Sequence, residues 1–192
     1  MTTLRAFIAV EIPPAIQQAI HSETESLRRA LGPDLVRWVP CKNLHLTLKF
    51  LGDISSAHVD AITAMLTAEA GHVSSFPLRL SGLGSFPTPK RARVLWVGIH
   101  APAALAALQH GIESAAAKLG YAAEERPFSP HLTIGRARQH ATASDQQAIW
   151  QALERTKVGD LGEAKISAVH LYKSDLNREG AVYTRLFSAP LK

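Results

Sequence analysis

Two short segments repeat one arrangement of side chains, His45-Leu46-Thr47-Leu48 and His131-Leu132-Thr133-Ile134. An imidazole has an unperturbed pKa of about 6.5, so it can give or take a proton near neutral pH. A threonine hydroxyl can donate a hydrogen bond to a phosphate oxygen without adding charge. Opening a cyclic phosphodiester needs a base that deprotonates water and an acid that protonates the departing alkoxide. The paired motifs therefore predict an acid–base site for phosphodiester chemistry.

Each motif lies on a predicted strand, whose successive side chains point to opposite faces. In the first, Leu44, Leu46, Leu48 and Phe50 share one face, and His45, Thr47 and Lys49 share the other. Burial explains the apolar face but not the repeat of histidine and threonine on the other. One such tetrad would be weak evidence, and we interpret the other seven histidines as structural or surface residues. No Asp, Glu or Cys stands at ligand spacing beside either motif, so we expect no metal and no cofactor.

The motifs lie 86 residues apart, which suits two lobes better than one local site. Hydrophobic periodicity, Pro and Gly predict an ordered series of strands and helices around each motif. We expect strands at 3–11, 36–39, 43–51, 76–83, 93–99, 131–138, 166–173 and 182–190, and helices near 15–31, 57–70, 102–119 and 144–155, with a polar loop at 84–92. This order predicts an α+β fold of two pseudo-symmetric lobes, each an antiparallel β-sheet with flanking helices, around a central cleft. Residues 1–192 would form one two-lobed domain with one motif in each half.

The composition is that of a folded protein, with 46% hydrophobic and 19% charged residues. The single cysteine, Cys41, excludes an internal disulfide, and no apolar run is long enough to cross a bilayer. We therefore expect a cytoplasmic protein without a membrane partner. The formal net charge of +5 modestly favours a phosphate-bearing partner such as a nucleic acid.

The chain resembles the two-histidine phosphoesterases, and among them the bacterial and archaeal RNA 2′,3′-cyclic phosphodiesterases, also called 2′-5′ RNA ligases. The resemblance covers nearly the whole chain and rests on segments of specific length and order. They are Arg5–Ala9, Arg37–Pro40, Asn43–Gly52, Gly82–Pro87, Arg93–Gly98, Glu125–Arg136, Leu171–Ser174 and Gly180–Tyr183.

This resemblance implies hydrolysis of 2′,3′-cyclic phosphate ends of RNA, such as those of tRNA fragments, to 2′-phosphomonoesters by a monomer. His45 would give its proton to the leaving 3′-oxygen, and His131 would activate water. Thr47 and Thr133 would hold phosphate oxygens. Arg136 would bind phosphate, but strict alternation places it on the face opposite His131. A bulge or strand end near Gly135 must then turn it inward.

Three further residues are candidates for contact with a nucleotide. Arg126 could instead pair with Glu124 or Glu125 on the surface, and Phe128 stands beside it. Phe7 could stack on a base, although an aromatic residue on a strand more often belongs to the core. Two other functions also remain open. One is the reverse reaction, in which a 5′-hydroxyl replaces water to form a 2′-5′ linkage, and the other is nucleotide binding without turnover.

Overall fold

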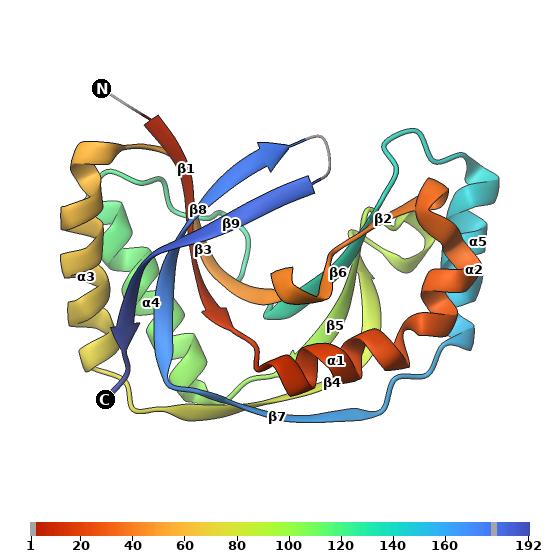
Figure 1. The fold of residues 1–192 in the computed structure, drawn as a ribbon, viewed down its shortest axis with the longest axis horizontal. Helices are drawn as coiled ribbons and strands as arrows, with labels where there is room; N and C mark the ends of the chain where they lie inside the picture. The colour runs from red at the N-terminus through yellow and green to blue at the C-terminus, as the bar shows by residue number, and fades with distance from the viewer. Residues whose placement is uncertain (1–2, 178–179) are drawn as a thin grey trace.

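The computed structural model describes residues 3–177 and 180–192, which form two antiparallel sheets and five α-helices (Figure 1). The first sheet has the strand order β3-β1-β8-β9 and the second β2-β6-β5-β4-β7. The strands are β1 Thr3–Glu11, β2 Val36–Trp38, β3 His45–Ser55, β4 Phe76–Phe86, β5 Val94–His100, β6 His131–Ala137, β7 Asp160–Ile166, β8 Ala168–Asn177 and β9 Gly180–Pro190. The helices are α1 Pro14–Glu23, α2 Glu25–Leu35, α3 Val59–Gly71, α4 Ala103–Lys118 and α5 Ala143–Arg155. This arrangement confirms the predicted α+β class and its two sheets.

The order of elements along the sequence had suggested one lobe for each half of the chain, but the two sheets do not divide the chain in this way. Strands β8 and β9 come from the end of the chain, but β8 pairs with β1 from its beginning. The first motif therefore lies in a sheet built from both ends of the chain, and the second motif in a sheet built from the middle. Local patterns predict strands, whereas strand partners depend on long-range packing.

Helices cover the back of each sheet and leave the other side to the motifs. At one end of the molecule α3 and α4 pack behind the first sheet, and at the other α2 and α5 lie beside β2 (Figure 1). Apolar residues three to four positions apart make a buried stripe along α4, formed by Leu105, Leu108, Ile112 and Ala116. No helix in the described part of the chain is long and apolar enough to cross a membrane.

The predicted helix over 15–31 is two helices, because the backbone leaves helical geometry at Thr24. The buried Thr24 hydroxyl donates to the Ile20 carbonyl at 2.7 Å, and this satisfies it inside the core. Helical geometry is interrupted again at Gly32, with φ 61°, where the sequence predicted the end. The chain then makes another turn to Leu35.

Strands β3, β4 and β8 extend beyond the predicted residues, and β7 is an additional strand. Strand β3 does not stop at Gly52 but passes through it, at φ 72°, and reaches Ser55. Strand β4 runs on to Phe86, into the predicted polar loop. Strand β7 was not predicted, because its glycine and charged residues weaken the apolar signal, although Leu161, Ala164 and Ile166 are buried.

Candidate active site

The first motif lies on β3 beside β1. His45 stands opposite Glu11 and Thr47 opposite Ala9, so both motif side chains share the face of Phe7 and Ala9. The His45 Nδ1 atom lies 2.7 Å from the carbonyl oxygen of Asn43. A carbonyl only accepts hydrogen bonds, so Nδ1 carries the proton and Nε2 is left for acid–base chemistry.

The second motif lies on β6 beside β5 and repeats this geometry. His131 stands opposite Gly98 and Thr133 opposite Trp96. The His131 Nδ1 atom is 2.7 Å from the carbonyl oxygen of Ser129, two residues earlier as in the first motif. Both imidazoles are therefore held in the same tautomer by the backbone just before their strands. We call the sheet faces that carry His45 and His131 the motif faces.

Aromatic rings flank each histidine. The His45 ring lies 4.9 Å from Phe7 and 5.1 Å from Tyr183, centroid to centroid. The His131 ring lies 4.9 Å from Phe86 and 6.5 Å from Trp96. These rings reduce hydration around both imidazoles and fix their orientation.

Trp96 also lies on the second motif face, opposite Thr133 and near His131. It fits because the position opposite it on β4 is a glycine: a Cβ at Gly84 would lie 2.2 Å from the indole. Gly84, which pairs with Trp96 in the β4–β5 hairpin, was the sequence signal that could have placed it there.

A β-bulge follows each motif and changes which residues face outward. Along β3, Thr47 pairs with Ala9 and Lys49 with Ile8, so Leu48 is the extra residue. Lys49 therefore joins the core side with Ile8, and Phe50, opposite Phe7, joins the motif face. The prediction from strict alternation was wrong for both residues.

The corresponding bulge on β6 supplies the turn that Arg136 requires. Thr133 pairs with Trp96 and Gly135 with Leu95, so Ile134 is the extra residue. Gly135 points to the core, where a Cβ would lie 2.7 Å from Val36 and 2.9 Å from Trp38. The next residue, Arg136, therefore lies on the same face as His131 and Thr133.

The charge of Arg136 acts on both imidazoles. Burial lowers the pKa of His45 and of His131, the carbonyl hydrogen bonds raise these pKa values, and the nearby Arg136 guanidinium lowers them. The strands that carry the two motifs, β3 and β6, contact one another, so Arg136 of the second sheet lies near the motif strand of the first. Two imidazoles of lowered pKa beside a cation suit proton transfer at an anionic phosphorus centre.

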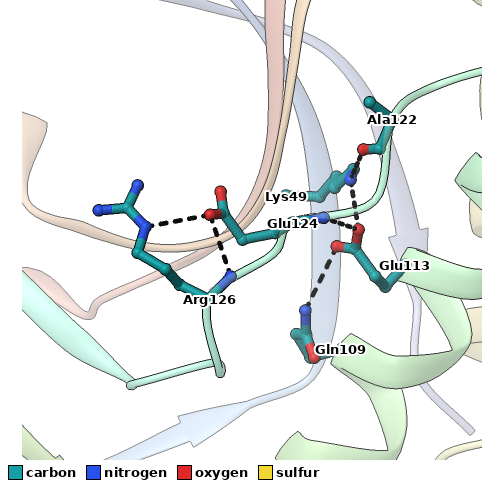
Figure 2. A network of polar contacts seen from close by, with 6 residues as sticks. All are labelled: Lys49, Gln109, Glu113, Ala122, Glu124 and Arg126. Carbon is teal, nitrogen blue, oxygen red and sulfur yellow. Dashed lines mark hydrogen bonds and ion pairs between the residues drawn. The ribbon is translucent and has the colours of Figure 1, made fainter.

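A buried polar network links the strand of the first motif to the segment that leads into the second (Figure 2). The Lys49 ammonium donates to the Glu113 carboxylate on α4 and to the Ala122 carbonyl. Glu113 also accepts the Glu124 N–H at 2.8 Å. The backbone at Ala122 and Glu124, in the segment that leads to His131, is thereby anchored. Local sequence patterns do not indicate this role for Lys49.

The predicted nucleotide contacts are placed differently from the motif residues. The Arg126 side chain is exposed and pairs with Glu124, Nε to Oε1 at 3.2 Å (Figure 2), which was one of the alternatives. Phe128 packs against the main core. Phe7 is buried and stacks on Tyr172, with ring centroids 5.3 Å apart. Contact of these three side chains with a nucleotide stays a prediction.

A second cluster on the first motif face was not anticipated. The Tyr172 hydroxyl donates to the Glu11 carboxylate, and Arg185 donates to the same oxygen at 3.1 Å. Burial, with the contact to Glu11, raises the pKa of Tyr172, so its hydroxyl stays a donor. His170 Nε2 lies 3.9 Å from the other Glu11 oxygen. The cluster supports Phe7, and through it His45.

Among residues 3–177 and 180–192, no three side chains of His, Cys, Asp or Glu gather as metal ligands would.

Comparisons with known proteins identify the family of the chain. The family model described as the 2′-5′ RNA ligase superfamily matches residues 12–178. An RNA 2′,3′-cyclic phosphodiesterase of Methanothermobacter thermautotrophicus is 29% identical, over 94% of this chain and 95% of its own. Another, from Escherichia coli, is 35% identical over 69% of this chain and 71% of its own.

Solved structures extend the likeness to the whole fold. A protein of Thermus thermophilus has a TM-score of 0.81 and 26% identity and covers 98% of each chain. E. coli LigT complexed with 3′-AMP has a TM-score of 0.78 and 28% identity, covering 100% of this chain and 99% of that one. With a family match over most of its length, this chain belongs to the 2′-5′ RNA ligase superfamily.

Proposed function

We propose that the protein hydrolyses 2′,3′-cyclic phosphate ends of RNA to 2′-phosphomonoesters without a metal ion. The observation that carries this proposal is the pair of imidazoles on adjacent motif faces, each with Nδ1 bound to a carbonyl and Nε2 left over. The relatives named RNA 2′,3′-cyclic phosphodiesterase support the substrate class.

In the proposed reaction, water attacks phosphorus and gives its proton to Nε2 of His131. The bond between phosphorus and the 3′-oxygen breaks, and that oxygen takes a proton from Nε2 of His45. The phosphate stays on the 2′-oxygen. Because His45 is more deeply enclosed than His131, its place suits the leaving group, whereas His131 suits a nucleophile that arrives from solvent. Each proton transfer contributes about 10²–10⁴-fold to the rate.

Thr47, Thr133 and Arg136 would bind the non-bridging phosphate oxygens. The two hydroxyls lie one step along the motif faces from the histidines, and Arg136 lies beyond the second bulge. The guanidinium supplies positive charge where negative charge develops on the pentacoordinate phosphorus. Both threonines are partly buried, which strengthens their hydrogen bonds relative to those made in water.

The same site can run the reaction in reverse, with a 5′-hydroxyl in place of water, because both directions pass through one pentacoordinate state. Water is present at far higher concentration, so hydrolysis should dominate. A binding module without turnover would not need two imidazoles with matched tautomers. A monomer in the cytoplasm, acting on tRNA fragments, remains our prediction.

The test uses a short RNA that ends in a 2′,3′-cyclic phosphate, incubated in EDTA, with the phosphate position on the product determined. We expect a 2′-phosphate, and a loss of about 10²–10⁴-fold with either His45→Ala or His131→Ala. His21→Ala, an exposed residue on α1, is the matched control. Activity that EDTA abolishes and a divalent ion restores would contradict the metal-free reaction. A 3′-phosphate product would contradict the leaving-group assignment.

A further inference from the structure

Two arginines face one another on the second motif face. Arg37 on β2 stands directly opposite Arg136 on β6. Their neighbours Val36 and Trp38 are turned to the other side, where they close over Gly135. Arg37 therefore lies on the same face as Arg136. Like charges directly across a strand pair destabilise a sheet, so this arrangement has a cost in the unliganded protein.

Neither arginine is neutralised by a carboxylate in residues 3–177 and 180–192. Other arginines of the chain do have such partners: Arg185 pairs with Glu11, and Arg79 with Glu163. Both Arg37 and Arg136 are exposed. Two adjacent cations without a counterion form a site for an anion with more than one negative group.

The pair lies near the first sheet, because β6, which carries Arg136, contacts β3, which carries His45. The ring of Tyr183 on β9 contacts His45 edge-on. Burial raises the pKa of Tyr183, and the charges of Arg136, Arg37 and Arg5 act against that rise. Arg5 differs from them, because Asp53 stands opposite it in the β1–β3 register.

The strand order shows which of the two arginines lies nearer the edge of the sheet. Strand β2 is the edge of its sheet, and β6 lies between it and β5. Arg136 is the inner cation, on the strand of His131, and Arg37 is the outer one. An RNA chain whose terminal cyclic phosphate lies at the histidines must leave the site in the 5′ direction, carrying its next phosphodiester outward.

We propose that Arg37 binds the phosphodiester on the 5′ side of the terminal nucleotide, as a second phosphate subsite beside Arg136. This inference rests on the proposed function and deepens it: the enzyme would prefer an RNA chain to a free cyclic nucleotide. A guanidinium suits this role because it binds phosphate through two parallel hydrogen bonds without reading the base.

The test compares a substrate that carries a phosphodiester on the 5′ side of its terminal nucleotide with one that does not. One is a nucleoside 2′,3′-cyclic phosphate with a free 5′-hydroxyl, and the other is a dinucleotide that ends in the same group. Arg37→Gln should lower kcat/KM for the dinucleotide about tenfold or more, a hydrogen-bonded charge contact being worth that much, and leave the mononucleotide within about twofold. Arg29→Gln, the same change at an exposed residue of α2, should affect neither.

Two readouts separate the subsite from a structural role and from the reaction itself. Adenosine 2′,5′-bisphosphate should bind wild type more tightly than adenosine 2′-phosphate, and Arg37→Gln should abolish that difference. The variant should unfold at the same or a higher denaturant midpoint, because it relieves the repulsion from Arg136. Equal losses on both substrates, or no loss on either, would overturn the subsite. Failure of wild type to hydrolyse either substrate would overturn the proposed function, and the binding measurement would still decide the role of Arg37.

Discussion

The two motif strands share a design and differ in the residues that follow it. On β3 and on β6 a histidine binds the carbonyl two residues before it, a threonine shares its face, and a one-residue bulge follows. After the bulge, β3 presents Phe50 outward and Lys49 to the core. At the equivalent positions β6 presents Arg136 outward and Gly135 to the core.

This difference distinguishes the imidazole, which both strands supply, from the guanidinium, which only β6 supplies after its bulge. The proposed reaction uses two imidazoles because one proton is taken up while another is given. It uses one guanidinium at the phosphate, and the charge of Arg136 lowers the pKa of both histidines from a single strand. The bulge on β6 turns Arg136 to the motif face, and the equivalent bulge on β3 turns Lys49 to the core.

Arg136 on β6 and Phe50 on β3 occupy equivalent positions, and we expect the largest difference in activity between variants of these two residues. Arg136→Gln should lower kcat/KM about 10²–10³-fold, because the transition state loses its charged donor. Phe50→Ala should lower it about tenfold at most, since an exposed ring can contribute only stacking. Steady-state rates on a terminal cyclic phosphate measure both. Comparable losses in kcat/KM would show that the residues after the two bulges contribute equally to the reaction.

The core side of the two bulges predicts an asymmetry of stability. Lys49→Met leaves the Glu113 carboxylate largely buried without its cation, which should cost about 3 kcal/mol. Lys49→Met with Glu113→Gln should recover part of this loss, because the amide can still accept from the Glu124 N–H. Denaturant unfolding measures both proteins. A double variant less stable than Lys49→Met would mean that the carboxylate is not the source of the cost.

Thr47 and Thr133 hold equivalent positions in the two motifs, so we expect their substitution to lower kcat/KM equally. Thr47→Val and Thr133→Val keep the side-chain shape and remove one hydroxyl each. We expect losses in kcat/KM of about tenfold for either variant, the value of one hydrogen bond to a charged group. A large loss from one and none from the other would place the phosphate against a single lobe.

The pKa values of His45 and His131 are both lowered, and this predicts the smallest effect, a shift in the pH dependence of activity. Activity is lost at high pH when His45 gives up its proton and at low pH when His131 gains one. Both pKa values are lowered from 6.5, so the bell-shaped profile of kcat/KM should peak below that pH. Arg136→Gln removes a positive charge, raises both pKa values and should move the peak upward. An optimum above pH 7 in wild type would contradict the burial of the two imidazoles.

The sequence predicted the faces of the four motif side chains better than the arrangement around them. The paired motifs are local, and alternation was enough to place His45, Thr47, His131 and Thr133 correctly. It failed one residue later, at Lys49 and Phe50, because a bulge depends on the partner strand and not on the strand's own pattern. The position of Arg136 was reached only by requiring a bulge near Gly135.

Long-range pairing was harder to predict for the same reason. Nothing local indicates that β8 pairs with β1, or that Lys49 reaches Glu113 and residue 122. The helix over 15–31 was divided by Thr24, whose hydroxyl bonds to the backbone and takes the place of a continuous helix.

The division of labour between the lobes is the central claim, and a substrate with sulfur in place of the 3′-bridging oxygen tests it most directly. A thiolate leaves without protonation, because thiols have pKa values of about 8.5, far below those of alcohols. On this substrate His45→Ala should regain most of the wild-type rate, whereas His131→Ala should stay inactive for want of a base. Recovery of His131→Ala instead, or of neither variant, would contradict the assignment of His45 as the acid and His131 as the base.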